Sequence, residues 1–138
     1  MATTYKQLIL DREAPERLRV TFNHPPINLV DPDTLGELHE LVSELESASE
    51  VKVVVLESAD PDFFLAHWDI SGAARSPGPG TEAPSWIDIS QRLAEAPVVS
   101  MAVIRGRTRG IGSEIALACD MRFASIERAI FGDRKSVV

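Results

Sequence analysis

The residues best placed to do chemistry lie between Gly110 and Glu114, after an apolar stretch that predicts a strand. Glycines between a strand and a helix allow backbone N–H groups to converge on one point. The N-terminus of the following helix adds partial positive charge there. Such a turn binds an anion, either a phosphate or an oxyanion that forms during a reaction. A plain tight turn explains the same residues equally well, so both interpretations stay open.

Two better-known motifs are absent from this turn. A dinucleotide-binding turn has the pattern G-x-G-x-x-G, but Ile115 stands where the third glycine would be. A nucleophile elbow has the pattern G-x-S-x-G, whereas Ser113 has isoleucines two residues before and after it. We therefore do not expect Ser113 to be a nucleophile.

Glu114 begins a helical stretch that is otherwise apolar through Cys119. In a semi-buried pocket, a carboxylate of this kind is a candidate general acid or base. A carboxylate in the first turn also stabilises the helix dipole, and without further context this structural role is the more common one.

A second candidate segment runs from Phe63 to Ile70, after another apolar stretch. By itself it reads as a loop that packs on the core, with Asp69 as a possible helix N-cap. His67 in such a loop is more often a hydrogen-bonded structural histidine than a catalyst.

The elements expected to position these segments alternate between strands and helices. Strands are expected at residues 6–10, 18–22, 53–56, 98–104 and 121–124, with a charged turn at 11–17 and a loop at 76–84. Helices are expected from Asp31–Pro32, over residues 84–95, and from Glu114. This order indicates an α/β fold. The continuous apolar runs 53–56 and 98–104 predict neighbouring parallel strands that are buried on both faces.

Composition narrows the classes of function. The 138 residues suffice for one domain, and a net charge of −7 disfavours nucleic acid as the main partner. The single cysteine, Cys119, excludes an internal disulfide framework and a metal site of the CxxC kind, so no metal is expected. No apolar stretch of about 18 residues and no signal peptide are evident, so we expect a cytoplasmic protein that does not enter a membrane.

Taken together, the segments resemble the enoyl-CoA hydratase/isomerase family, the crotonase superfamily. Residues 64–70 resemble its F-S-A-G-A-D-L segment, and 96–106 resemble its K-P-V-I-A-A-V-N-G strand. Residues 110–125 are very similar to G-G-G-C-E-L-A-L-A-C-D-I-R-I-A-S, and Phe131-Gly132 matches the start of F-G-Q-P-E. The resemblance implies a crotonase-like fold, a repeated β-β-α spiral, in a single domain over 1–138 that is incomplete at the C-terminus, with the similarity ending after about residue 132.

The resemblance also implies roles for individual residues. The family stabilises the enolate of an acyl-CoA thioester with two backbone N–H groups, which here are those of Trp68 and Ile111. Glu114 matches the family's first catalytic glutamate. Residues beside these positions are then expected to bind substrate, namely Ala66, His67, Asp69 and Gly110.

Several positions depart from the family pattern. His67 and Ile111 replace glycines and add bulk near the thioester, and Lys135 stands where the family has its second glutamate. Asp133 is the nearest carboxylate that could take that glutamate's place. The arginines at 75, 105, 107 and 109 are candidates to hold CoA phosphates, although a solvated surface position is the better explanation for at least two of the last three.

The expected function is that of an acyl-CoA enzyme of the hydratase/isomerase type. Its substrate carries the CoA, so no separate cofactor is expected, and the family's trimers and hexamers imply a homo-oligomer. One alternative is a catalytically silent acyl-CoA-binding or interaction fragment that lacks the second carboxylate. Another is thioester hydrolysis or decarboxylation in the same oxyanion hole.

Overall fold

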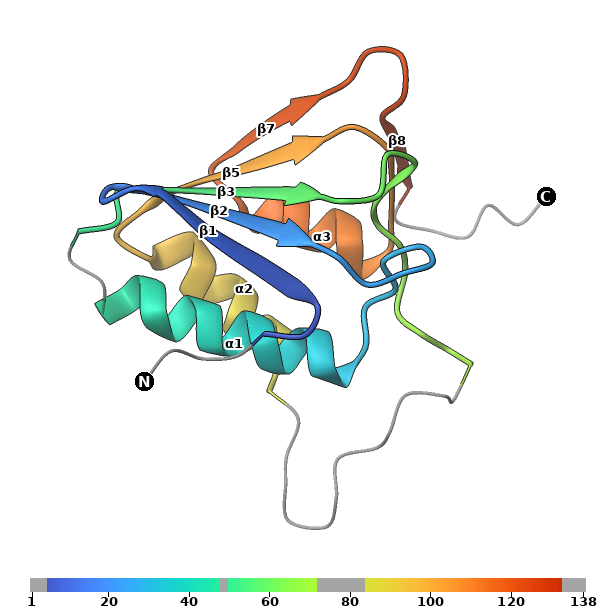
Figure 1. Ribbon diagram of the computed structural model, residues 1–138. Coiled ribbons are helices and arrows are strands. Elements are labelled where there is room, and N and C mark those ends of the chain that lie inside the picture. Colours follow the sequence, from blue (N-terminus) through green and yellow to red (C-terminus); the bar gives the residue numbers. More distant parts are fainter. Residues whose placement is uncertain (1–4, 48–49, 72–83, 133–138) are drawn as a thin grey trace, which may run out of the picture.

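A computed structural model describes residues 5–47, 50–71 and 84–132 of the chain (Figure 1). Three β-β-α units follow one another, and a last pair of strands begins a fourth. The units comprise β1 (Leu8–Ala14), β2 (Arg17–Phe22) and α1 (Pro32–Ser47); β3 (Val53–Ser58), β4 (Phe63–Leu65) and α2 (Trp86–Glu95); β5 (Val99–Ile104), β6 (Arg107–Arg109) and α3 (Ile111–Ala118); and β7 (Met121–Ala124) with β8 (Ile130–Gly132).

The strands form two sheets. The large sheet has the order β1-β2-β3-β5-β7, and the small, parallel sheet has the order β4-β6-β8. From the second unit onward, the first strand of each unit joins the large sheet and the second joins the small one. The expected α/β class and the repeated β-β-α path are therefore confirmed.

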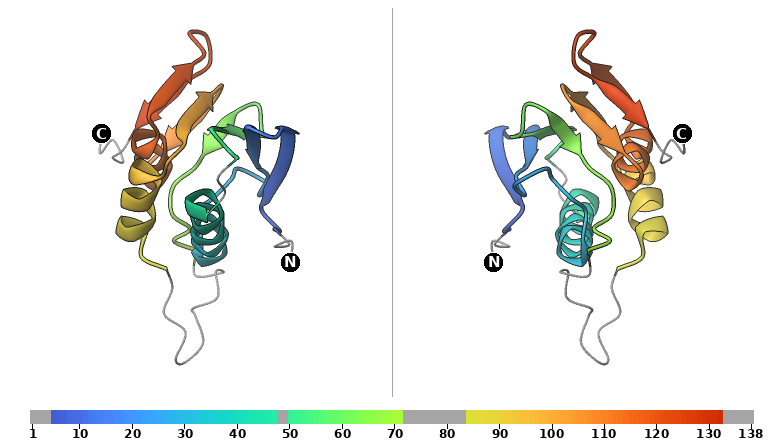
Figure 2. Two further views of the ribbon diagram at one scale, coloured as in Figure 1. Left: turned by 90° about the vertical axis from the view of Figure 1, so that its left-hand side faces the viewer. Right: turned by 90° about the vertical axis from the view of Figure 1, so that its right-hand side faces the viewer.

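Strands β3 and β5 pair in parallel, with Val54 opposite Ser100, which confirms the predicted neighbours. The helices pack on one face of the large sheet, as the side views show (Figure 2). Val54 and Leu56 are buried against them, whereas Val53 and Val55 on the opposite face are only half-buried. The expectation that this strand is buried on both faces is thus wrong, because helices cover only one.

Helix α1 begins where the sequence predicts. The Asp31 carboxylate accepts a hydrogen bond from the Thr34 N–H at 2.9 Å, and the Asp31 N–H donates to the Thr34 hydroxyl at 3.1 Å. This reciprocal cap satisfies N–H groups that a helix start leaves without partners. Its apolar side buries Leu38, Leu41 and Leu45 in the core.

Other boundaries differ from those expected. Strand β1 continues to Ala14 through the charged residues, where Glu13 pairs with Arg17 and Arg19 of β2. Helix α3 begins at Ile111, three residues before the expected start. The three-residue strands β4 and β6 occupy segments expected to be a loop and a turn, and β8 is a further strand for which the sequence carried no prediction. No helix among the described residues is long and apolar enough to cross a membrane.

Candidate active site

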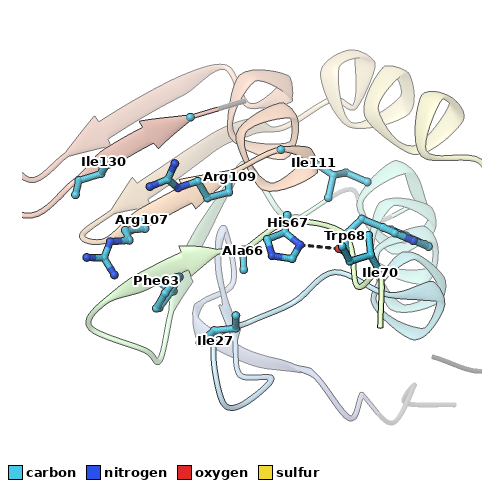
Figure 3. Close-up of a pocket in the computed structure, with 12 residues that line it drawn as sticks. Ile27, Phe63, Ala66, His67, Trp68, Ile70, Arg107, Arg109, Ile111 and Ile130 are labelled. Carbon is cyan, nitrogen blue, oxygen red and sulfur yellow. Dashed lines mark hydrogen bonds between the residues drawn. The ribbon is translucent and has the colours of Figure 1, made fainter. Parts of the chain in front are cut away.

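A cavity of about 720 Å³ opens between the segment after β4, the first turn of α3 and one face of the small sheet (Figure 3). Five of the seven candidate residues line it: Ala66, His67, Trp68, Gly110 and Ile111. The rest of the lining is mostly apolar, with two arginines, and comprises Ile27, Phe63, Ile70, Arg107, Arg109, Ile130 and Gly132.

The first turn of α3 presents its backbone to this cavity. Gly110 has φ 51° and ψ −123°, a conformation that side chains disfavour, so the chain reverses there before the helix begins. The first helical bond runs from the Glu114 N–H to the Gly110 carbonyl at 3.2 Å. The N–H of Ile111 therefore has no acceptor inside the helix.

Gly112 allows the helix to lie directly against the segment that follows β4. A Cβ atom at this position would lie 2.7 Å from both the Cβ and the carbonyl oxygen of Leu65, and 3.0 Å from the carbonyl oxygen of Ala66. Because glycine lacks that atom, the two backbones approach closely. This contact brings Trp68 and Ile111 to the same cavity.

The orientation of Trp68 follows from its bridge to Val30. The Val30 N–H donates to the His67 carbonyl at 3.1 Å, and the Asp69 N–H donates to the Val30 carbonyl at 2.8 Å. In parallel pairing, bonds on both sides of a residue leave its own N–H directed away from the partner strand. The Trp68 N–H therefore points away from Val30.

These two backbone N–H groups have no hydrogen-bond acceptor among the residues that the structure describes. Both belong to residues that line one largely apolar cavity, and one of them lies at a helix N-terminus. Unpaired donors of this kind can stabilise an oxygen atom that gains negative charge.

His67 and Asp69 make local hydrogen bonds. The Nδ1 atom of His67 lies 2.7 Å from the Trp68 carbonyl oxygen and donates to it, so this ring nitrogen has a structural partner. Asp69 does not line the cavity, and its carboxylate accepts bonds from the hydroxyl and the N–H of Ser71. These bonds hold the pKa of the Asp69 carboxyl below its usual range.

Glu114 lies outside the lining of this cavity. Its side chain is exposed in a separate depression, where its Oε2 atom accepts a hydrogen bond of 2.8 Å from the Trp86 indole N–H. The structure thus shows an exposed carboxylate rather than a semi-buried one. Ile111 and Glu114 are three residues apart on α3, which makes them neighbours on one helix face. The carboxylate therefore lies one turn from the cavity and is held by a residue of α2.

Asn28, which the sequence analysis did not single out, fixes the segment that carries Trp68. It is 2% exposed, and its amide nitrogen donates to the Ser58 hydroxyl at 2.7 Å and to the Phe64 carbonyl at 3.1 Å. The backbone carbonyl of Asn28 accepts a hydrogen bond from the Ala66 N–H at 2.9 Å. Its φ of 58° is a conformation that asparagine tolerates better than most residues. That preference, in a proline-rich turn, is the only signal the sequence carried.

Three other candidate groups are held by hydrogen bonds, burial or an ion pair that give them structural roles. The Ser113 hydroxyl is buried and lies within hydrogen-bonding distance of the Thr108 and Gly132 carbonyl oxygens. Burial raises the pKa of the Cys119 thiol to about 12, which keeps it protonated at neutral pH. Arg105 pairs with Glu57 at 3.3 Å, away from the cavity, and residue 75 lies outside the described residues.

Residues 5–47, 50–71 and 84–132 contain no group of three or more His, Cys, Asp or Glu side chains that could hold a metal ion. What they offer chemically is backbone N–H donors in an apolar cavity, with one carboxylate nearby.

Comparison with known proteins identifies relatives of this arrangement. The family model described as enoyl-CoA hydratase/isomerase matches residues 17–136. A short-chain-enoyl-CoA hydratase of Clostridium acetobutylicum is 34% identical over 132 residues, which cover 91% of this chain and 48% of that protein. A carnitinyl-CoA dehydratase of Proteus mirabilis is 29% identical, over 78% of this chain and 42% of its own.

A solved structure is similar to this chain in both fold and sequence. A protein of Streptomyces avermitilis, described as a candidate enoyl-CoA hydratase, superposes with a TM-score of 0.79 and 40% sequence identity. The match covers 95% of this chain and 49% of the other. The chain thus spans about half the length of the curated relatives and solved structures that it matches.

Proposed function

The chain belongs to the enoyl-CoA hydratase/isomerase family, and from this membership we propose that it acts on acyl-CoA thioesters through an oxyanion hole built from the Trp68 and Ile111 N–H groups. The observation that carries this proposal is that both residues line one cavity while neither N–H has an acceptor among the described residues. The short-chain-enoyl-CoA hydratase and the carnitinyl-CoA dehydratase among its relatives support the same substrate class.

In this proposal the thioester carbonyl oxygen accepts a hydrogen bond from each N–H. When a proton leaves the neighbouring carbon, or a nucleophile adds to the double bond, the carbonyl becomes an enolate and its oxygen gains charge. Fixed donors then bind the enolate more strongly than the carbonyl, and one such donor contributes about 100- to 1,000-fold to the rate. Both donors are backbone groups, so the side chains of Trp68 and Ile111 are free to differ from those of the family.

Glu114 is the proposed general acid or base. It lies one helical turn from Ile111, and the indole N–H of Trp86 holds one of its carboxylate oxygens. From there the carboxylate delivers a proton to the substrate carbon or removes one from water. Ala66, His67 and Gly110 are proposed to contact the thioester, since all three line the cavity. Asp69, which follows Trp68 but does not line the cavity, is proposed to bind substrate at the rim of the cavity.

The exposure of Glu114 favours a second candidate function. Its carboxylate faces a depression separate from the cavity, and the family's second carboxylate position falls on Lys135, outside the described residues. A chain with the oxyanion hole but no catalytic carboxylate would bind acyl-CoA without catalysing a reaction. Thioester hydrolysis and decarboxylation are the alternative activities of such a chain, because they depend on the oxyanion hole rather than on a pair of carboxylates.

Turnover and binding, measured side by side, separate these candidates. The chain is assayed with short, medium and aromatic enoyl-CoAs, while thioester affinity is measured by calorimetric titration. Glu114→Gln is expected to lower the hydration rate at least about 100-fold with little change in affinity. Glu40→Gln, at an exposed position of α1, serves as the matched control and should change neither.

The possible outcomes separate the candidates. Binding without turnover by the unmutated chain selects the silent module. Turnover that survives Glu114→Gln indicates either that Asp133 carries the proton or that the reaction needs only the oxyanion hole. Absence of thioester binding contradicts both candidates.

We also propose that no separate cofactor is needed, because the reacting thioester already carries CoA. Self-association is proposed as well, since large apolar side chains of α3, β7 and β8 are exposed: Leu117, Met121, Phe123, Ile130 and Phe131.

A further inference from the structure

Two arginines project from β6 onto the cavity side of the small sheet. Side chains of a strand alternate between its faces, and Thr108, between them, is fully buried. Arg107 and Arg109 therefore share the other face, and both line the cavity. In Figure 3 their side chains extend from β6 in the same direction.

The floor of the cavity holds each guanidinium group in place. Phe63 of β4 pairs with Arg107 across the sheet, and the Arg107 Cζ atom lies 5.6 Å from the centre of its ring. Gly132 of β8 pairs with Arg109. A Cβ atom at Gly132 would lie 3.0 Å from Arg109 Nη1, so the guanidinium occupies the space that a side chain would fill.

This pair of positive charges has no acidic counterpart on the described residues. None of the cavity-lining side chains is a carboxylate, and within the described part of the chain neither arginine forms an ion pair. Neighbouring Arg105 contrasts with them, because it pairs with Glu57. In a chain of net charge −7, two unpaired arginines over an apolar floor form a site for an anion.

We propose that Arg107 and Arg109 bind a carboxylate on the acyl group of the substrate, so that the preferred thioesters are those of dicarboxylic acids. This inference rests on the proposed function, because it places the thioester oxygen at the Ile111 N–H. Arg109 lies only two residues before Ile111, which puts the guanidinium groups within the reach of a short acyl chain. The phosphates of CoA lie at the other end of the pantetheine arm from the thioester.

A matched pair of ligands tests the proposal. Glutaryl-CoA and pentanoyl-CoA both have five acyl carbons, but only the first ends in a carboxylate. Their dissociation constants, and that of free CoA, are measured for the unmutated chain. Because charge-assisted hydrogen bonds are strong, glutaryl-CoA should bind about tenfold more tightly than pentanoyl-CoA.

Variants identify the groups responsible. The double variant Arg107→Gln/Arg109→Gln should abolish the preference while leaving pentanoyl-CoA and free CoA binding unchanged. Arg107→Lys and Arg109→Lys, which keep the charge but lose the planar pair of donors, should each give an intermediate ratio. Arg105→Gln is the control and should keep the full preference. Because the ratio is taken within one variant, a general change in stability does not alter it.

The remaining outcomes overturn the inference. If the unmutated chain binds both thioesters equally, the inference is wrong while the proposed function stands. If the double variant loses affinity for all three ligands to the same extent, the arginines hold CoA phosphates instead. If neither thioester binds more tightly than free CoA, the proposed function fails and this inference fails with it.

Discussion

At the scale of single residues, the candidate site depends on backbone groups more than on side chains. Ile111 and Trp68 are bulky where the family has small residues, yet their N–H groups remain unpaired in the described structure. What the sequence must supply at these points is a close approach of two backbones. Gly112 meets that requirement, and it lies in the glycine turn whose residues resemble those of the family.

Gly112→Ala is expected to destabilise the chain by about 1–3 kcal/mol, because the new methyl group would overlap with Leu65. Equilibrium urea unfolding measures the change. Gly36→Ala is the matched control, since a Cβ atom there meets nothing within 4 Å inside α1. That substitution should instead raise stability by about 0.5–1 kcal/mol. Similar effects from both substitutions would contradict the packing described for α3.

At the scale of elements, the sequence predicts the elements of four or more residues well and the three-residue strands poorly. The periodic apolar positions of α1 and the apolar runs of β3 and β5 gave the correct types and the correct pairing. Three-residue strands such as β6 contain too few residues to show a period, so they read as turns. The small sheet that forms the cavity floor was therefore missed, together with the shared face of Arg107 and Arg109.

The place of Glu114 was also beyond prediction from the sequence. Its position at the start of an apolar helix indicated a semi-buried site, but burial depends on which segments cover that helix. In the described structure only Trp86 of α2 reaches the carboxylate. The sequence thus predicted the residue type and its helix, but not its exposure.

Asn28 ties together the ends of three elements, and Asn28→Ala is expected to cost about 2–4 kcal/mol of folding stability. The substitution removes the buried hydrogen bonds that the Asn28 amide donates to the Ser58 hydroxyl and the Phe64 carbonyl, and alanine tolerates the positive φ less well. Urea unfolding again measures the effect. Asn23→Ala, at an exposed position nearby, should stay within about 0.5 kcal/mol of the unmutated chain. A cost of that small size at Asn28 would contradict its role in holding the Trp68 segment.

At the scale of the whole molecule, the exposed apolar surface favours association between copies of the chain. Leu117 is 66% and Phe131 is 52% exposed, and both line one shallow depression between α3 and β8. Strand β7 lies at an edge of the large sheet, where its outer backbone groups have no strand partner in the described structure. Surfaces of this kind drive self-association.

Sedimentation velocity should therefore show species larger than a monomer at high concentration. Leu117→Glu/Phe131→Glu is expected to shift the distribution toward the monomer. Ile9→Glu, at a similarly exposed apolar position on the opposite sheet edge, should not. A monomeric unmutated chain would show that this surface does not drive association.

The central claim is that two backbone N–H groups polarise the carbonyl of a bound thioester. Isotope-edited infrared spectroscopy tests it directly, with an enoyl-CoA carrying a ¹³C-labelled thioester carbonyl. Hydrogen bonds from the Trp68 and Ile111 N–H groups weaken the C=O bond, so its stretching band should move to lower wavenumber on binding. The shift should persist in Glu114→Gln, because this carboxylate does not touch the carbonyl in the proposed arrangement. A bound thioester whose carbonyl band remains at its position in water would contradict the claim.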